Sequence, residues 1–279
     1  MICIPITARS IENTISEMIS ASKHADIVEL RIDYIPELQN AEACIEESLK
    51  RKIKPVIITN RPVREGGKFN GSEQDRLRLL QKAIDLGVDY VDVEYDSIKQ
   101  ITRRNSSKII ISHHNFKETP HNLSKIYDDI CQQKPDIVKI VTYANDITDN
   151  IRIFELLKSA KVPTISFCMG ELGYISRILT SKFGGFLTFA SLEKGKESAP
   201  GQLTADELSK IYHLKEINEE TKLYGIIGNP VSHSMSPAIH NASFIEKGLN
   251  NVYVPLKIAN IDAFMRECRK IDFQGFSVT

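Results

Sequence analysis

The segment Pro135–Val141, PDIVKIV, predicts a buried β-strand that carries one lysine in its middle. A run of β-branched residues is typical of a strand that is covered on both faces, as in a parallel sheet. A charged ammonium in such a strand costs free energy unless it is paired, neutralised or used in chemistry. Lys139 is therefore the first candidate for a functional residue, and a salt bridge to Glu29 or Glu94 is the alternative.

Similar β-rich runs recur along the chain and alternate with amphipathic helical segments. The runs cover residues 2–7, 26–33, 55–60, 88–95, 108–113, 136–141, 163–169 and 185–190. The helical segments cover residues 10–22, 37–50, 73–86, 122–133, 146–160, 174–182 and 204–217. Eight strands that alternate with helices predict an α/β fold, the (β/α)8 TIM barrel. A doubly wound open sheet is the alternative, but no GxGxxG motif follows the first strand.

One face of the predicted strands is rich in charged residues. Side chains alternate along a strand, and a barrel of this kind has its functional residues at the carboxyl ends of its strands. On five strands the inward face ends in Glu29 and Arg31, Arg61, Glu94, His114, and Lys139. A shared site explains this pattern better than scattered buried charges. The same alternation turns His113 toward the outer helices and His114 toward the site.

These groups support one kind of chemistry. A lysine in an apolar pocket near other cations favours its neutral amine, which attacks a ketone or aldehyde and forms an iminium. His114 is suited to remove a proton beside the iminium carbon, and Glu94 is expected to orient it. Arg31, Arg61 and Arg177 offer guanidinium groups for a carboxylate or hydroxyls.

The composition excludes several functions. Among 279 residues, 36 Lys and Arg balance 36 Asp and Glu, which removes any global electrostatic case for nucleic acid or anionic membrane as partner. The five cysteines form no CxxC pair, so reduced thiols are expected and no metal site is predicted. The start MICIPITARS does not resemble a signal peptide, and a cytoplasmic location is expected.

Seven segments together resemble the type I 3-dehydroquinate dehydratase family. They are VELRID, NRPVREGG, VDVEYD, ISHHNFKETP, DIVKIV, GYISRI and ESAPGQL, and the resemblance spans residues 1–215. It implies a (β/α)8 barrel that binds 3-dehydroquinate as a Schiff base and releases water to give 3-dehydroshikimate, a step in aromatic amino acid biosynthesis. It also implies that the dehydratase needs no cofactor, and relatives suggest a homodimer.

The resemblance assigns a role to each matching residue. Lys139 would form the Schiff base, His114 would act as general acid and base, and Glu94 would support His114. Arg177 would bind the substrate carboxylate. The other substrate-binding positions are Glu29, Arg31, Arg61, Ser198 and Gln202. Phe167, Met169 and Phe189 would line the pocket, and a plain core role is their alternative.

Residues 222–279 resemble the N-terminal substrate-binding segment of shikimate dehydrogenase, through the loop GNPVSHSMSPAIHN. The resemblance implies that Ser234, Ser236 and Thr279 contact shikimate; a helix cap over Pro237–Lys247 is the alternative role of the serines. The segment ends with FQGFSVT, residues 273–279. In that family, the strand that matches these residues leads on to the catalytic lysine and an NADP-binding domain. We therefore expect an incomplete dehydrogenase domain that is inactive in this chain, with NADP used only in a full-length bifunctional chain.

Two other functions stay open at this point. Another Schiff-base barrel, of the aldolase kind, would need Lys139 but not the combination of Arg177 and the SAPGQ segment. A non-catalytic binding module of the shikimate pathway would be indicated by the loss of a reacting residue, and none is substituted. Turnover of 3-dehydroquinate separates these alternatives.

Overall fold

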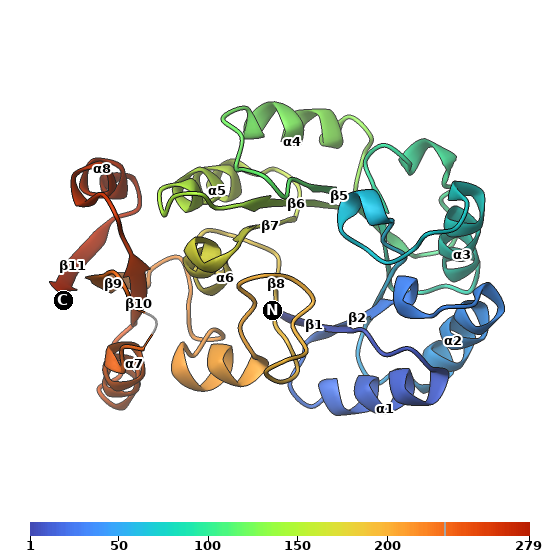
Figure 1. Ribbon diagram of the computed structural model, residues 1–279, viewed down its shortest axis with the longest axis horizontal. Helices are drawn as coiled ribbons and strands as arrows, with labels where there is room; N and C mark the ends of the chain where they lie inside the picture. The colour runs from blue at the N-terminus through green and yellow to red at the C-terminus, as the bar shows by residue number, and fades with distance from the viewer. Residues whose placement is uncertain (232) are drawn as a thin grey trace.

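The larger part of the molecule is a parallel β-barrel surrounded by helices (Figure 1). The computed structural model describes residues 1–231 and 233–279. The eight barrel strands are β1 (Ile2–Ile6), β2 (Ile27–Arg31), β3 (Val56–Thr59), β4 (Tyr90–Glu94), β5 (Lys108–His114), β6 (Ile137–Tyr143), β7 (Thr164–Met169) and β8 (Thr188–Phe189). Their hydrogen-bonded order is β7-β6-β5-β4-β3-β2-β1-β8. The Phe186 N–H donates to the Thr164 carbonyl at 2.8 Å and brings the two edge strands together, so the predicted barrel is confirmed.

The helices cover the outside of the sheet. They are α1 (Ile11–Ala21), α2 (Leu38–Arg51), α3 (Glu73–Asp85), α4 (Leu123–Cys131), α5 (Asp149–Ser159) and α6 (Tyr174–Ile178). Ser10 and Ser72 cap α1 and α3, because each hydroxyl accepts a hydrogen bond from the backbone N–H three residues on. The apolar faces of these helices pack on the outer face of the sheet and form the main core.

Two predicted helices are shorter than expected. The helix predicted over residues 204–217 is a π-helical turn over Glu207–Ile211, and His213 follows in the left-handed region at φ 48°. Helix α6 ends at Ile178 instead of residue 182, because the chain turns back toward β8 with Gly184 at φ 83°. Apolar periodicity continued through both turns and gave no sign of where the helix ends.

A second apolar cluster fills the inside of the barrel. Cys3, Ile27, Ile57, Ile110, Ile137, Ile165 and Leu187 pack there, and all are buried. On β2, β3, β5 and β6 these residues lie nearer the amino ends than the charged groups described below. These apolar side chains therefore fill the barrel toward the amino ends of its strands, and a site can form at the carboxyl edge.

The smaller part is a parallel sheet of three strands, β9 (Lys222–Gly228), β10 (Asn251–Lys257) and β11 (Phe273–Val278), in the order β10-β9-β11. Helices α7 (Ser236–Glu246) and α8 (Ile261–Glu267) connect them. This part lies beside α5 and α6, at the outer side of the barrel (Figure 1), and Lys257 Nζ is 2.6 Å from Glu171 Oε2.

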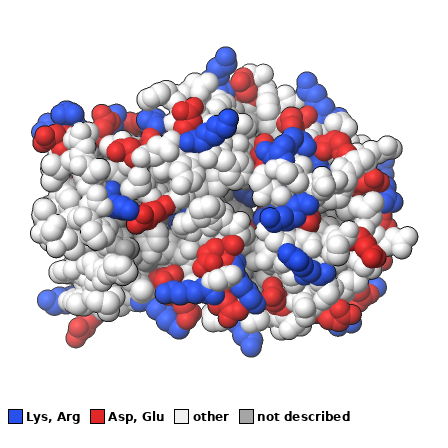
Figure 2. Space-filling model, viewed as in Figure 1, with Lys and Arg blue, Asp and Glu red and all other residues white. Residues whose placement is uncertain are grey.

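The visible surface carries acidic and basic side chains side by side (Figure 2), in keeping with equal numbers of the two. No helix in the described part of the chain is long and apolar enough to cross a membrane.

Candidate active site

A pocket opens at the carboxyl edge of the barrel strands. Its lining includes Glu29, Arg31, Arg61, Glu65, His114, Lys139, Phe167, Met169, Arg177, Phe189, Ser198 and Gln202. The structure thus brings together the predicted lysine, the predicted histidine and all six predicted substrate-binding residues of the barrel. His114 lines the pocket and His113 does not. Glu94 is also absent from the lining, and Glu65 is a member that the sequence analysis had given no role.

Lys139 is ion-paired in this structure. Its side chain is 6% exposed, and Nζ lies 2.8 Å from Asp92 Oδ2 and 3.6 Å from Glu29 Oε1. The same nitrogen is 4.5 Å from the centre of the Phe189 ring. The surroundings of Nζ therefore combine an aromatic ring with two carboxylates, and the predicted apolar pocket near other cations is only part of them. The alternative of a salt bridge holds for Glu29, and Asp92 replaces Glu94 as the nearest carboxylate.

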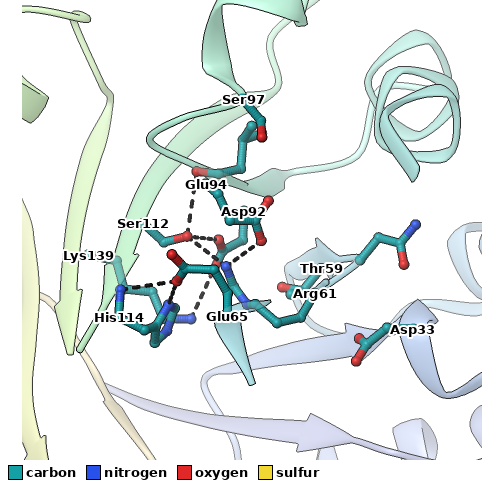
Figure 3. Close-up of polar contacts among 12 residues, drawn as sticks. Asp33, Thr59, Arg61, Glu65, Asp92, Glu94, Ser97, Ser112, His114 and Lys139 are labelled. Atoms are coloured by element: carbon teal, nitrogen blue, oxygen red, sulfur yellow. Dashed lines mark hydrogen bonds and ion pairs between the residues drawn. The ribbon is translucent and has the colours of Figure 1, made fainter. Parts of the chain in front are cut away.

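Asp92 was not selected from the sequence, yet it is the most connected acid of the site (Figure 3). It is fully buried, its Oδ2 also accepts from Arg61 Nη2 at 2.6 Å, and its Oδ1 accepts from the Ser112 hydroxyl at 2.6 Å. Burial alone would raise the pKa of Asp92, but the charges of Arg61 and Lys139 outweigh it and hold that pKa well below its usual range. Asp92 is therefore a permanent anion beside Nζ, suited to pair with an ammonium or an iminium.

His114 is oriented by Glu65 and not by Glu94. Glu65 Oε2 is 2.8 Å from His114 Nδ1 and also accepts the His114 backbone N–H at 3.1 Å. Glu94 instead accepts from Arg61 Nη1 at 2.6 Å and from Arg76. The expected Glu94–His114 contact is thus wrong. Glu65 lies in the short turn after β3, outside the strand, where alternation assigns no direction to a side chain.

The pKa values of this pair favour a basic histidine. Burial, and then the positive charges of Arg61 and Lys139, hold the pKa of His114 well below its usual range. Burial raises the pKa of Glu65 to about 7. When Glu65 is ionised, its Oε2 accepts the proton on Nδ1, which leaves the lone pair on Nε2 free to act as a base. When Glu65 is protonated, it donates to Nδ1 and the imidazole proton moves to Nε2.

This pair predicts the acid limb of the pH–activity profile. We expect kcat to fall about tenfold per pH unit below pH 7, because the fraction of ionised Glu65 falls there, whereas His114 stays neutral to lower pH. Glu65→Gln should lower kcat about 10²-fold and remove that limb. The control is Glu171→Gln, at a carboxylate 57% exposed. An unchanged limb in Glu65→Gln would contradict the assignment of Glu65.

Arg177 is a buried cation with free donors. It is fully buried on α6, and within the described residues its Nε and Nη1 have no hydrogen-bond partner. Its Nη2 donates to the Pro200 carbonyl at 3.3 Å, and the guanidinium carbon lies 4.3 Å from the centre of the Phe167 ring. Burial lowers the pKa of Arg177 to about 10, so it remains charged at neutral pH. An unpaired buried charge is costly, and an anionic ligand would pair with it.

The other two arginines are largely occupied. Arg31 makes two hydrogen bonds to Asp33, at 2.7 and 2.8 Å. The guanidinium of Arg61 donates hydrogen bonds to Asp92, Glu94 and Ser112, at 2.6, 2.6 and 2.7 Å. Both line the pocket, but their positive charge is balanced by the protein. Arg177 therefore offers the strongest anion-binding position among the three.

The SAPGQ segment forms one wall of the pocket and rests on α6. Gln202 Oε1 accepts from the Ser198 backbone N–H at 2.8 Å and its hydroxyl at 3.2 Å, while Gln202 Nε2 has no partner among the described residues. Gly201 has φ 73°, and a Cβ there would lie 2.3 Å from the Gly170 carbonyl oxygen. Only glycine fits this close approach, which holds the segment against the backbone of Gly170.

In the smaller part, Ser234, Ser236 and Thr279 lie near the carboxyl ends of β9 and β11. The Ser234 hydroxyl accepts from the Ser236 backbone N–H at 3.2 Å, where α7 begins. The Thr279 N–H donates to the Ile227 carbonyl at 3.0 Å. The serines are half-buried and Thr279 is exposed, so they are accessible to a ligand. Met235 is the N-cap residue of α7 and no side-chain hydrogen bond caps this helix, so the alternative role of the serines as a helix cap is not supported.

A buried lysine beside a neutral histidine, at the carboxyl edge of a (β/α)8 barrel, is the arrangement of barrel enzymes that act through an iminium. No cluster of His, Cys, Asp or Glu suited to hold a metal occurs in residues 1–231 or 233–279. A family model described as type I 3-dehydroquinase matches residues 2–219, so the chain belongs to that family. A second model, described as shikimate dehydrogenase substrate binding domain, matches residues 226–279.

Known proteins with similar sequences carry one or both of these domains. The chain is 42% identical to the chloroplastic bifunctional 3-dehydroquinate dehydratase/shikimate dehydrogenase of Arabidopsis thaliana; the match covers 100% of this chain and 48% of that protein. It is 36% identical to the 3-dehydroquinate dehydratase of Methanopyrus kandleri, covering 77% of this chain and 99% of that protein. The solved dehydroquinate dehydratase and shikimate dehydrogenase from S. pombe aligns with TM-score 0.65 and 26% identity, over 99% of this chain and 56% of that one.

Proposed function

We propose that residues 2–219 act as a lyase that dehydrates 3-dehydroquinate to 3-dehydroshikimate through a Schiff base on Lys139. The observation that carries this proposal is that Lys139 and Arg177 line the same pocket. Arg177 offers two buried donors without a partner within the described residues, which selects a carboxylate. Lys139 selects a carbonyl carbon. A substrate with both groups, held between them, fits the pocket and the family to which the chain belongs.

The reaction follows from these positions. Neutral Nζ adds to the ketone, and the carbinolamine takes up one proton and loses water to give an iminium, whose positive charge Asp92 stabilises. The proton is released again when the iminium is hydrolysed. Nε2 of His114 then removes a proton from the carbon beside the iminium, and an enamine forms. The enamine expels the hydroxyl group from the next carbon, which leaves as water with the proton from His114. Hydrolysis of the conjugated iminium consumes one water and releases the product, so the net change is the loss of one water.

Arg177 should determine how tightly the substrate binds. In Arg177→Lys we expect KM to rise about 10²-fold, since a lysine loses the two-point contact with a carboxylate, and kcat to change much less. Steady-state kinetics with 3-dehydroquinate measure both constants. Arg104→Lys is the matched control, because Arg104 is 62% exposed and lies outside the pocket. A tenfold or larger loss in kcat at unchanged KM would contradict the carboxylate assignment.

Direct turnover tests the function as a whole. The purified chain should convert 3-dehydroquinate to a product whose new carbon–carbon double bond is conjugated with its ketone, followed by ultraviolet absorbance. A chain of the aldolase kind would instead cleave a carbon–carbon bond and yield two smaller carbonyl compounds, which mass spectrometry separates from a dehydration product. A chain that binds 3-dehydroquinate without converting it would support the binding-module alternative.

For residues 226–279 we propose a shikimate-binding surface built on Ser234, Ser236 and Thr279, supported by the family match and by their position beyond the carboxyl ends of β9 and β11. The chain spans about half the length of the bifunctional relative from Arabidopsis thaliana. Reduction of 3-dehydroshikimate with NADP chemistry is thus proposed only for a protein that also carries the cofactor-binding domain. Calorimetric titration of this chain with shikimate tests the binding part; no heat of binding at millimolar shikimate would contradict it.

A further inference from the structure

A row of charged side chains of alternating sign runs through the barrel wall to Lys139. Figure 3 shows four of its members, Glu94, Arg61, Asp92 and Lys139. Arg76 donates to Glu94 Oε2, and Glu94 Oε1 accepts from Arg61 Nη1 at 2.6 Å. Arg61 Nη2 then donates to Asp92 Oδ2 at 2.6 Å, and the same oxygen accepts from Lys139 Nζ at 2.8 Å. All five side chains are at least nine-tenths buried. We call these five residues the charge chain.

The outer end of the charge chain is firmly fixed. Arg76 belongs to α3, an outer helix whose other buried residues are apolar, and yet its guanidinium is fully buried. Glu73 accepts from Arg76 Nε and Nη2 at 2.9 and 2.7 Å, and the Asn60 carbonyl accepts from Nη1 at 3.0 Å. Buried ion pairs contribute little to stability compared with apolar residues of similar size. Stability alone therefore gives no reason for this arginine.

We propose that Arg76 and Glu94 are positioning residues that control how much positive charge Nζ of Lys139 carries, acting through Arg61 and Asp92. The inference rests on the Schiff-base function proposed above. Asp92 Oδ2 accepts hydrogen bonds from both Lys139 and Arg61. The attraction between Asp92 and a cation at Nζ therefore depends on the charge and position of Arg61. Glu94 draws Arg61 outward, and Arg76 balances Glu94. Both the ammonium and the iminium of Lys139 are cations, so the charge chain acts on both.

Few other charges reach Nζ. The ionisable groups that face it are Asp92 on β4, Glu29 on β2, Arg61 after β3, His114 on β5, Cys3 on β1, and Arg177 across the pocket. Of these, Glu29 is held separately by the Thr59 hydroxyl at 2.7 Å. Among the ionisable groups of residues 1–231 and 233–279, only Asp92 and Arg61 connect Nζ to Glu94 and Arg76.

The test uses borohydride trapping of the chain with 3-dehydroquinate over a range of pH. Trapping requires the neutral amine, so it rises with pH. Glu94→Gln removes a negative charge and should move the rising limb to lower pH by about one unit, because a cation at Nζ becomes less favourable. Arg76→Gln removes a positive charge and should move the limb to higher pH by a similar amount. The double variant should return close to the unmodified chain.

Opposite shifts distinguish a charge effect from a structural one. Loss of packing would move both single variants in the same direction or not at all, and either result overturns the inference. If Arg76→Gln does not fold, Glu94→Gln and the double variant still test the inference. The trapping limb should move in Glu94→Gln and stay in place in the double variant. Arg78→Gln is the matched control on α3, where Arg78 is 55% exposed and pairs with Glu42 at 2.9 Å. Absence of trapping in the unmodified chain would overturn the Schiff-base function itself.

Discussion

Lys139→Arg should abolish turnover of 3-dehydroquinate, with a loss of about 10⁴-fold or more in kcat, while the chain stays folded. Arginine keeps the positive charge beside Asp92 but cannot supply a neutral amine, so no iminium forms. Replacement by an uncharged residue would leave Asp92 with one cation fewer in a buried position and would cost stability as well. The arginine variant separates the chemical role of Lys139 from its role as a counter-ion.

Two measurements check this prediction. Borohydride treatment with 3-dehydroquinate, followed by peptide mass mapping, should place a reduced adduct on Lys139 in the unmodified chain and on no residue in Lys139→Arg. Thermal unfolding should show that the variant is folded. Lys125→Met provides the control for general loss of a lysine, since Lys125 is exposed on α4. Full turnover in Lys139→Arg would contradict covalent catalysis in this pocket.

The sequence predicted most accurately those site residues that lie within strands. Lys139 pairs in register with Ser112, two residues before His114 on β5, so alternation alone turns Lys139, Ser112 and His114 inward. The same rule turned His113 away from the pocket. These positions follow from strand periodicity. A shift of one residue along a strand would turn the apolar neighbours of Lys139 and His114 toward the site and the two polar side chains toward the outer helices.

The errors concern residues whose partners lie outside the strands. Glu65 follows β3 in a turn, and its contact with His114 depends on how that turn folds over the pocket. The EGG motif that contains Glu65 was part of the family resemblance, and it was the signal that could have revealed its role. Glu94 lies within β4, but its partner Arg76 lies on α3, where an amphipathic pattern does not distinguish a buried arginine from an exposed one.

Asp92 shows a different limit. It lies on the same face of β4 as Glu94, and both carboxylates were possible partners of Lys139 from alternation. The choice between them depends on the stagger of the barrel strands and on Arg61, which contacts both carboxylates at 2.6 Å. Pattern and composition describe each strand by itself, whereas the relative height of neighbouring side chains is set by the closed barrel.

His114→Gln should lower kcat by about 10³- to 10⁴-fold and yet leave the Schiff base intact. Glutamine fills a similar volume and can hydrogen-bond to Glu65, but it cannot accept a proton at neutral pH. The first iminium should therefore form on Lys139 and accumulate, because the proton beside its carbon is not removed. This result would differ from that of Lys139→Arg, in which no covalent species forms at all.

The mass of the trapped adduct identifies the step that stops. In His114→Gln, borohydride should trap on Lys139 an adduct that still contains the hydroxyl group lost in the reaction, whereas the unmodified chain should also give the dehydrated adduct. His113→Gln is the matched control, because His113 is the next residue on β5 and does not line the pocket. If His113→Gln lost activity and His114→Gln did not, the inward direction of His114 on β5 would be wrong. If His114→Gln trapped mainly the dehydrated adduct, proton removal would belong to another group, and Glu65 would be the nearest carboxylate able to take it, since its Oε2 lies 2.8 Å from the imidazole and its pKa is about 7.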